Sequence, residues 1–204
     1  MIDATARRLI DPPLDFVARR LARTGVGANA VTVAGFGVGM LACGLLAVEQ
    51  HLAALACITL NRVADGVDGA LARRLGPTDL GGYLDITLDF VFYAAVPFAF
   101  AVGRPVDALP ACFLVLAFVG TGTSFLAFAV VAAKRGLTTD RRGRKAMYYL
   151  GGLTEGAETI ALFVLVCLAP DWFAPLAWGF GTLCWMTTAM RVACAVTAFR
   201  PGPP

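Results

Sequence analysis

Charged residues, histidines and paired cysteines are scarce in this chain of 204 residues. Charged residues make up 15% of it, and its single histidine, His51, falls in a connection between two apolar segments, where it is a poor candidate for a catalytic base. The six cysteines lie in apolar segments without a CxxC pair or a Cys/His ligand spacing, so we expect buried thiols and no zinc site. The basic residues lack interleaved aromatic side chains, and no nucleic-acid partner is expected.

Polar helix faces are also missing from most of the long segments. Hydrophobic residues account for 58% of the sequence, whereas helices of a soluble protein would show a polar face at helical spacing. A helix needs about 20 apolar residues to cross the hydrocarbon core of a bilayer. Six stretches meet or approach this length: 30–48, 52–73, 82–102, 108–133, 147–169 and 173–198. The sequence therefore predicts an all-α integral membrane protein with six transmembrane helices.

The first 25 residues have a different character. Met1–Thr24 contains five arginines and three aspartates, which does not fit a cleavable signal peptide. Arginines on one face and apolar residues on the other predict an amphipathic helix at the membrane interface. We expect one membrane domain over 1–204, with a juxtamembrane amphipathic helix in 1–25 and a six-helix bundle in 29–199.

The basic residues are distributed unequally between the two sides of the predicted bundle. The N-terminus, the 134–146 loop, Arg73, Arg74 and Arg200 lie on one side, and Arg104 is the only lysine or arginine in the connections of the other side. The positive-inside rule then predicts an inner-membrane protein with both termini in the cytoplasm. A basic cytoplasmic face also suits anionic membrane lipids.

Four aspartates lie where the second apolar stretch gives way to the third. Asp65 and Asp68 are spaced i, i+3, and Asp85 and Asp89 are spaced i, i+4, so each pair shares one helix face. If the two helices form an antiparallel hairpin that turns near Pro77, the four carboxylates reach matching depths below the cytoplasmic surface. Ionisable residues in a membrane span mark a functional site by default, and we therefore expect one cluster.

Such a cluster needs cations, because four carboxylates in a partly apolar cavity cannot all stay ionised alone. Ligand sets made only of oxygen favour Mg²⁺ or Mn²⁺, with Ca²⁺ as a further choice. Two divalent ions would grip a diphosphate and offset charge that develops on phosphorus. The alternative is a hairpin held by Asp–Arg pairs, with Arg62, Arg73 or Arg74 as partners and glycines for close helix packing.

This segment resembles the signature of the CDP-alcohol phosphatidyltransferases, which reads D-x2-D-G-x2-A-R, a short spacer, and G-x3-D-x3-D. In this chain the signature residues are Asp65, Asp68, Gly69, Ala72, Arg73, Gly81, Asp85 and Asp89. The spacer between Arg73 and Gly81 has seven residues, one fewer than the family pattern, and the deletion falls in the loop between the helices. Six spans after a cytoplasmic amphipathic helix are similar to the family layout.

The resemblance implies transfer of a phosphatidyl-type group from a CDP-linked lipid, such as CDP-diacylglycerol, to the hydroxyl of a small alcohol, with release of CMP. It implies a metal cluster of Asp65, Asp68, Asp85 and Asp89 holding two Mg²⁺ or Mn²⁺ ions, with Asp89 as the general base. It also implies a homodimer. The implied donor-binding residues are Asn29, Ala30, Val31, Thr32, Gly69, Ala72, Arg73 and Thr78. The reverse arrangement, a CDP-amino alcohol with diacylglycerol as acceptor, stays an alternative.

The acceptor is less defined. The candidate acceptor-binding residues are Lys134, Arg135, Glu158 and Arg191. Relatives with phosphorylated acceptors tend to carry arginines around residues 155–159, where this chain has Glu155 and Glu158 and no basic residue. This favours an unphosphorylated or amine-bearing acceptor. Two structural alternatives stay open: an ion pair of Glu158 with Arg191, and an ion pair of Arg62 with Glu155 or with the aspartates of the cluster.

Two other functions fit the carboxylates less well. An aspartate-rich membrane prenyltransferase would need a longer chain and a second aspartate-rich motif. A non-catalytic metal carrier would show inverted halves or broken helices, and neither is seen in the sequence.

Overall fold

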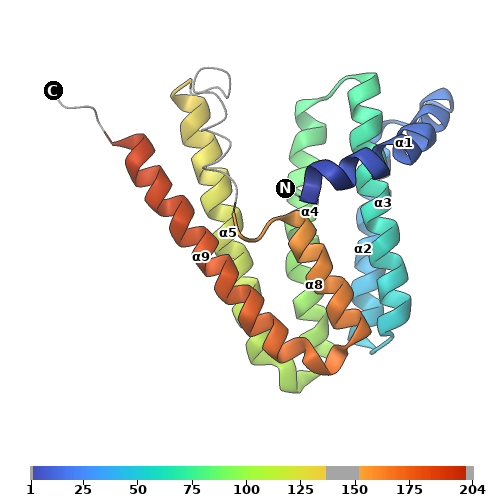
Figure 1. Cartoon of the computed structure of the whole chain (residues 1–204). Helices are drawn as coiled ribbons and strands as arrows, with labels where there is room; N and C mark the ends of the chain where they lie inside the picture. The colour runs from blue at the N-terminus through green and yellow to red at the C-terminus, as the bar shows by residue number, and fades with distance from the viewer. Residues whose placement is uncertain (1, 137–151, 201–204) are drawn as a thin grey trace. The chain divides into compact units, whose positions relative to one another are not determined.

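The computed structural model describes residues 2–136 and 152–200, and every regular element in these ranges is a helix (Figure 1). The chain divides into two compact units, Met1–Ala108 and Leu109–Pro204. The all-helical class expected from the long apolar stretches is confirmed for the described residues.

The first unit is built from four long helices and a short turn of 3-10 helix. They are α1 (Ile2–Arg23), α2 (Ala28–Ala47), α3 (His51–Leu75), α4 (Asp79–Gly103) and η1 (Pro105–Asp107). Helix α2 packs against both α3 and α4. The contact is close because α2 presents glycines: a Cβ on Gly35 would lie 2.8 Å from the Cβ of Ala64, and one on Gly39 would lie 2.9 Å from the ring of Phe92. Small residues are the usual means of bringing helix backbones together in a membrane.

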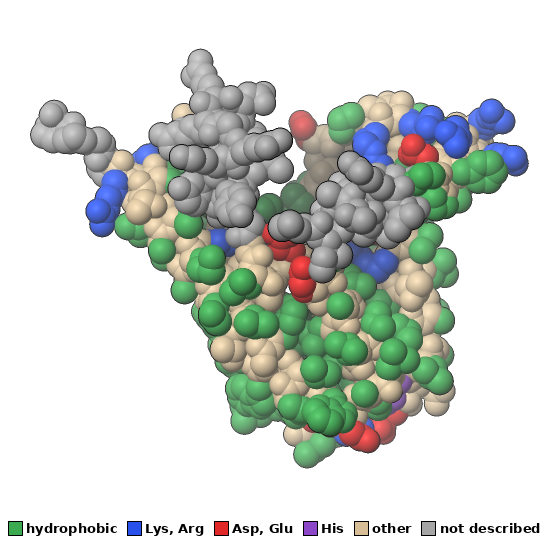
Figure 2. All heavy atoms as spheres, viewed as in Figure 1, with side chains coloured by type: hydrophobic (Ala, Val, Ile, Leu, Met, Phe, Trp, Pro, Cys, Tyr) green, Lys and Arg blue, Asp and Glu red, His purple; other side chains and the backbone are tan. Residues whose placement is uncertain are grey.

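Helix α1 packs against α3. Ala18 is fully buried in a cluster with Ala70 and Leu71 of α3, and the carboxylate of Asp15 lies 3.9 Å from the guanidinium of Arg74. Figure 2 shows arginine side chains gathered by the C-terminal part of α1, whose last turn carries Arg20 and Arg23. A helix in residues 1–25 is thus present, and its position at a membrane interface stays a prediction.

The turn between α3 and α4 lies where the hairpin argument predicted it. Helix α3 ends at Leu75, and Gly76 follows with φ of 99°, a left-handed conformation that favours glycine. Thr78 then caps α4, because its hydroxyl oxygen accepts a hydrogen bond of 3.0 Å from the backbone N–H of Gly81. This turn sets the register in which α3 and α4 present their carboxylates.

The second unit contains α5 (Ala108–Lys134, which begins one residue before the unit), α8 (Gly156–Leu168), η2 (Pro170–Trp172) and α9 (Phe173–Phe199). Glycines again mark close approaches between long helices: a Cβ on Gly120 of α5 would lie 3.1 Å from the Thr188 hydroxyl of α9, and one on Gly181 of α9 would lie 2.6 Å from the Phe113 ring of α5.

Four described segments are long and apolar enough to cross a membrane: Ala28–Ala47, Asp79–Gly103, Pro105–Lys134 and Pro170–Phe199. Large hydrophobic side chains stay exposed along them, including Leu41 at 57%, Phe98 at 66% and Val130 at 67%, and green hydrophobic atoms cover much of the face in Figure 2. A multi-pass membrane protein is therefore supported, because this surface suits lipid better than water.

Two of the six predicted spans lack this support. Helix α3 has 25 residues, but its charged side chains reduce its apolar character. Helix α8 has 13 residues, and the first part of the predicted stretch, 147–151, lies outside the described residues, as does most of the basic 134–146 loop. The count of six spans stays a prediction.

Candidate metal and nucleotide site

Three carboxylates of the first unit converge on one point. Asp65 and Asp68 project from α3 and Asp85 from α4, and one oxygen of each lies within 4.8 Å of the others. Asp68 is buried, and its Oδ2 has no hydrogen-bond partner. A buried carboxylate oxygen without a donor is costly, and the mutual repulsion of three carboxylates adds to that cost. A divalent cation would relieve both, so this oxygen donor set fits Mg²⁺ or Mn²⁺.

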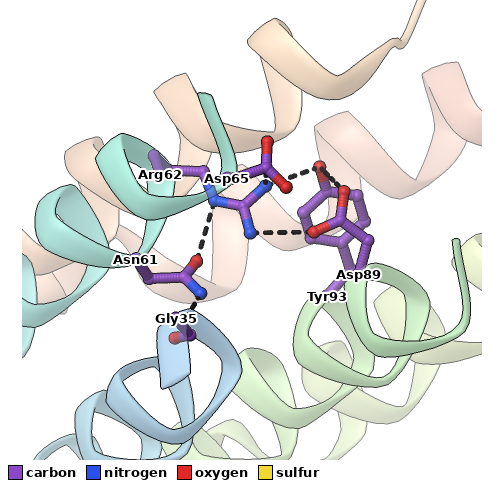
Figure 3. A network of polar contacts seen from close by, with 6 residues as sticks. All are labelled: Gly35, Asn61, Arg62, Asp65, Asp89 and Tyr93. Carbon is purple, nitrogen blue, oxygen red and sulfur yellow. Dashed lines mark hydrogen bonds and ion pairs between the residues drawn. The ribbon is translucent and has the colours of Figure 1, made fainter. Parts of the chain in front are cut away.

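Asp89, the fourth aspartate of the signature, has a different environment. Arg62 Nη2 donates a hydrogen bond of 2.8 Å to Asp89 Oδ1, and the Tyr93 hydroxyl donates a longer one of 3.4 Å to Asp89 Oδ2 (Figure 3). The guanidinium of Arg62 also lies 3.7 Å from the carboxylate of Asp65. All four aspartates line one pocket, as expected from their matching distances to the turn near Pro77. Asp89 is bound by a guanidinium, whereas the carboxylates of the other three face one another.

A second, larger cavity of about 430 Å³ lies in the same unit. Residues of α2, α3, α4 and the turn between α3 and α4 line it, and its volume is within the range of ligand pockets, roughly 300–1,000 Å³. Thr32, Asp68 and Asp85 line this cavity and the carboxylate pocket alike. Asp68 and Asp85 therefore lie in the wall that the two pockets share, and Asp65 and Asp89 line the carboxylate pocket alone.

Most of the residues implied for donor binding line the large cavity. Those that do are Asn29, Thr32, Gly69, Ala72 and Thr78. A Cβ on Gly69 would meet only the end of the Arg73 side chain, at 3.6 Å, so the backbone of α3 is open to the cavity at this position. The loop residue Thr78 is in the lining although the spacer is one residue short.

The remaining three donor candidates do not line the cavity. Ala30 is exposed, and Val31 packs against the apolar cluster formed by α1 and α3. Arg73 is exposed, and its guanidinium lies beside Gly69 at the edge of the cavity. Helical geometry explains the split, since Asn29 and Thr32 share one face of α2 while Ala30 and Val31 point elsewhere.

Asn61 is a site residue that the sequence reasoning missed. It is 3% exposed, and its side chain accepts a hydrogen bond of 2.8 Å from Arg62 Nε while donating one of 2.8 Å to the backbone oxygen of Gly35. The available signal was a polar amide within an apolar stretch, next to an arginine. The pairing of Arg62 with aspartates of the cluster, one of the two alternatives left open, is confirmed.

The acceptor candidate Glu158 and its neighbour Glu155 have structural partners within the second unit. Glu155 and Glu158 form a capping box at the start of α8, in which the Glu158 carboxylate accepts a hydrogen bond of 3.1 Å from the Glu155 backbone N–H. Glu155 Oε1 also accepts one of 3.2 Å from the backbone N–H of Gly152. Within the described residues, the alternative of a Glu158–Arg191 ion pair is not seen.

Two of the three basic acceptor candidates bind backbone oxygens. Arg191 donates a hydrogen bond of 3.0 Å to the carbonyl of Thr121, and Arg135 donates one of 2.9 Å to the carbonyl of Phe199. Lys134 is exposed in the last turn of α5. Arg191 and Arg135 thus join α5 to α9, and a role for any of the three in acceptor binding stays a prediction.

Comparison with known proteins gives consistent results. Residues 26–199 match the family model of CDP-alcohol phosphatidyltransferase. The inner membrane protein YnjF of Escherichia coli K12 is 53% identical over 193 residues, 94% of either chain. An archaetidylinositol phosphate synthase of Pyrococcus horikoshii is 32% identical over 98 residues, which are 48% of this chain and 52% of that protein.

Solved structures show the same fold. The phosphatidylinositol phosphate synthase of Mycobacterium tuberculosis with CDP-DAG bound superimposes with a TM-score of 0.68 at 20% identity, over 94% of this chain and 98% of that one. The same enzyme in complex with manganese and citrate gives a TM-score of 0.66 over 93% of each chain.

Proposed function

Because the chain belongs to the CDP-alcohol phosphatidyltransferase family of enzymes, we propose that it transfers a phosphatidyl group from CDP-diacylglycerol to the hydroxyl of a small alcohol, releasing CMP. The observation that carries this proposal is the shared wall, in which Asp68 and Asp85 face both the carboxylate cluster and the large cavity. A diphosphate at this wall would meet the cluster while its nucleotide occupied the cavity. The mycobacterial neighbour with CDP-DAG bound supports this choice of donor.

The metal site of the proposal consists of Asp65, Asp68 and Asp85, and we expect two ions. The neighbour crystallised with manganese supports a divalent cation, as does the orphaned Asp68 Oδ2. Bound Mg²⁺ or Mn²⁺ would offset the negative charge that builds on the phosphoryl and leaving-group oxygens during displacement.

The protein's own residues supply the remaining steps. Asn29, Thr32 and Thr78 offer polar groups to the nucleotide, and Gly69 allows it to approach the backbone of α3. Asp89 accepts the proton of the acceptor hydroxyl, whose oxygen attacks the β-phosphorus. The bond from that phosphorus to the bridging oxygen breaks, and CMP leaves with the bond's electron pair.

Two acceptor classes are supported by different observations. The absence of a basic residue from residues 154–159 favours an amino alcohol, but the capping box gives Glu155 and Glu158 a structural role, which weakens the case for their binding an amine. The relatives from Pyrococcus horikoshii and Methanothermobacter thermautotrophicus are archaetidylinositol phosphate synthases, which favours a phosphorylated inositol. Amino alcohols and phosphorylated inositol are both small polar alcohols, and we propose an acceptor of this kind.

The proposal includes an inner-membrane location with both termini and the active site on the cytoplasmic side. The asymmetry of the basic residues supports this orientation, and the Escherichia coli relative is named an inner membrane protein. A homodimer stays part of the proposal through the family resemblance.

The test is CMP release by the purified protein with Mg²⁺ and CDP-diacylglycerol, against a panel containing serine, ethanolamine, glycerol 3-phosphate, inositol and inositol phosphate. We expect release that depends on one of these acceptors and is lost in Asp89→Asn. A parallel reaction of CDP-choline or CDP-ethanolamine with diacylglycerol tests the reverse arrangement. Folded protein that releases no CMP in any of these reactions would contradict the proposed function.

A further inference from the structure

Arg62 lies at the centre of a network that joins three helices (Figure 3). Its Nε donates to the side-chain oxygen of Asn61, whose amide nitrogen is anchored on the Gly35 carbonyl of α2, each bond being 2.8 Å long. Its Nη2 donates to Asp89 of α4, also at 2.8 Å. A chain of short hydrogen bonds therefore runs from the backbone of α2 through α3 to one carboxylate of the candidate site.

The guanidinium is held in one orientation. The Arg62 side chain is 17% exposed, and its central carbon lies 5.2 Å from the ring centroid of Phe92 and 5.7 Å from that of Tyr93. A planar fork with several fixed donors can satisfy Asn61 and Asp89 together, which the point charge of a lysine cannot do. The network thus fixes the direction from which Asp89 Oδ1 is approached.

The two oxygens of Asp89 are consequently unequal. Oδ1 takes the short bond from Arg62, while Oδ2 is contacted by the Tyr93 hydroxyl at 3.4 Å, near the limit for a hydrogen bond. Asp89 is also absent from the group of three carboxylates whose oxygens converge. Arg62 lies closer to Asp89, at 2.8 Å, than to Asp65, at 3.7 Å, and the three aspartates whose oxygens converge are available to hold metal.

We propose that Arg62 is a positioning residue for the transfer reaction: it replaces metal as the counter-cation of Asp89, binds Oδ1 and leaves Oδ2 to accept the proton of the acceptor. This inference rests on the proposed function, in which Asp89 is the base. It separates the four aspartates of the signature into a metal set, Asp65, Asp68 and Asp85, and a base that a protein cation holds.

Two consequences distinguish this role from one in which Arg62 only stabilises the packing of the helices. Without Arg62, Asp89 loses its fixed orientation and turnover falls, since misplacement of a reacting group by about 1 Å can cost roughly 10²-fold. Metal binding changes in the opposite direction, because the site loses a positive charge and Asp89 becomes available as a further ligand. Removing this positive charge from beside the carboxylates should therefore tighten the binding of a divalent cation.

The experiment compares Mn²⁺ affinity, measured by electron paramagnetic resonance, with kcat and the KM for CDP-diacylglycerol in the unaltered protein, Arg62→Ala and Arg62→Lys. Arg104→Ala is the matched control, because it removes an arginine that lies 3.0 Å from the carboxylate of Asp107, outside the site. We expect Arg62→Ala to bind Mn²⁺ more tightly, to lose about 10² in kcat with little change in KM, and to recover part of its kcat when guanidinium ion is added. The control should show none of these changes.

Several outcomes would overturn the role of Arg62 alone: weaker Mn²⁺ binding by Arg62→Ala, an unchanged kcat, or the same response in the Arg104→Ala control. If Arg62→Ala does not fold, Arg62→Lys must still lose kcat while keeping its Mn²⁺ affinity, since it retains the charge without the fork. Failure of the unaltered protein to bind Mn²⁺ would overturn the proposed metal site itself, and the role of Arg62 with it.

Discussion

Replacing Gly69 by alanine separates the stability of the fold from the binding of the donor. The new Cβ would lie 3.6 Å from the Arg73 guanidinium, an ordinary contact with the end of an exposed side chain, so the fold has no clash to relieve. Within a helix, alanine is more favourable than glycine by about 1 kcal/mol. We therefore expect Gly69→Ala to be as thermally stable as the unaltered protein or slightly more stable.

Donor binding should change in the opposite direction, because the same methyl group enters the cavity of about 430 Å³. An added methyl in a filled, close-packed site costs about 1–3 kcal/mol, which corresponds to roughly 5- to 150-fold in affinity. The assay is binding of CDP-diacylglycerol in detergent with Mg²⁺, together with the thermal midpoint of the empty protein.

Gly37→Ala is the matched control for this variant. Gly37 is also a helix glycine, with nothing within 4 Å of an added Cβ, but it lies outside the lining of the cavity. It should gain the same helix preference and bind the donor normally. Unchanged affinity in Gly69→Ala, or equal losses in both variants, would refute the assignment of this cavity to the nucleotide.

Three further substitutions test individual residues of the site. Asp68→Ala removes the buried member of the carboxylate cluster, and Mn²⁺ titration should show weaker metal binding together with the loss of metal-dependent donor binding; unchanged Mn²⁺ affinity would count against the ligand set. Asp89→Asn should abolish CMP release while Mn²⁺ and donor still bind, and turnover near the unaltered rate would exclude Asp89 as the base. Glu158→Ala removes an acceptor of the capping box, so thermal denaturation should show a loss of about 1 kcal/mol in stability, with CMP release per folded molecule unchanged. A large rise in acceptor KM in Glu158→Ala would instead show that Glu158 contributes to acceptor binding.

The sequence predicted the cluster well because its elements are local. The spacings i, i+3 and i, i+4 set helix faces, and a turn at Gly76 and Pro77 fixes the register of α3 against α4. Few other arrangements were available to Asp65, Asp68 and Asp85 once both segments were helical. The family resemblance implied Asn29, Ala30, Val31 and Thr32 together, and of these only Asn29 and Thr32 line the cavity.

The preference of Arg62 for Asp89 over the other aspartates could not be predicted in this way. It depends on Asn61 reaching the Gly35 carbonyl, which requires α2 to lie close against α3, and helix packing of that kind is not encoded in spacing along one segment. The structural role of Glu155 and Glu158 was missed for a different reason. The spacing of Glu155 and Glu158 matches a capping box, a signal that is visible in the sequence, and both carboxylates accept hydrogen bonds from backbone N–H groups.

The dependence of CMP release on divalent cations tests the central claim most directly, because the function rests on Asp65, Asp68 and Asp85 holding metal beside the donor cavity. The measurement is the rate of CMP release from CDP-diacylglycerol with the acceptor that the panel identifies, before chelation, after removal of metal, and after Mg²⁺ or Mn²⁺ is restored. We expect release to stop in chelator and to return with either ion. Release that continues unchanged in chelator would contradict the account.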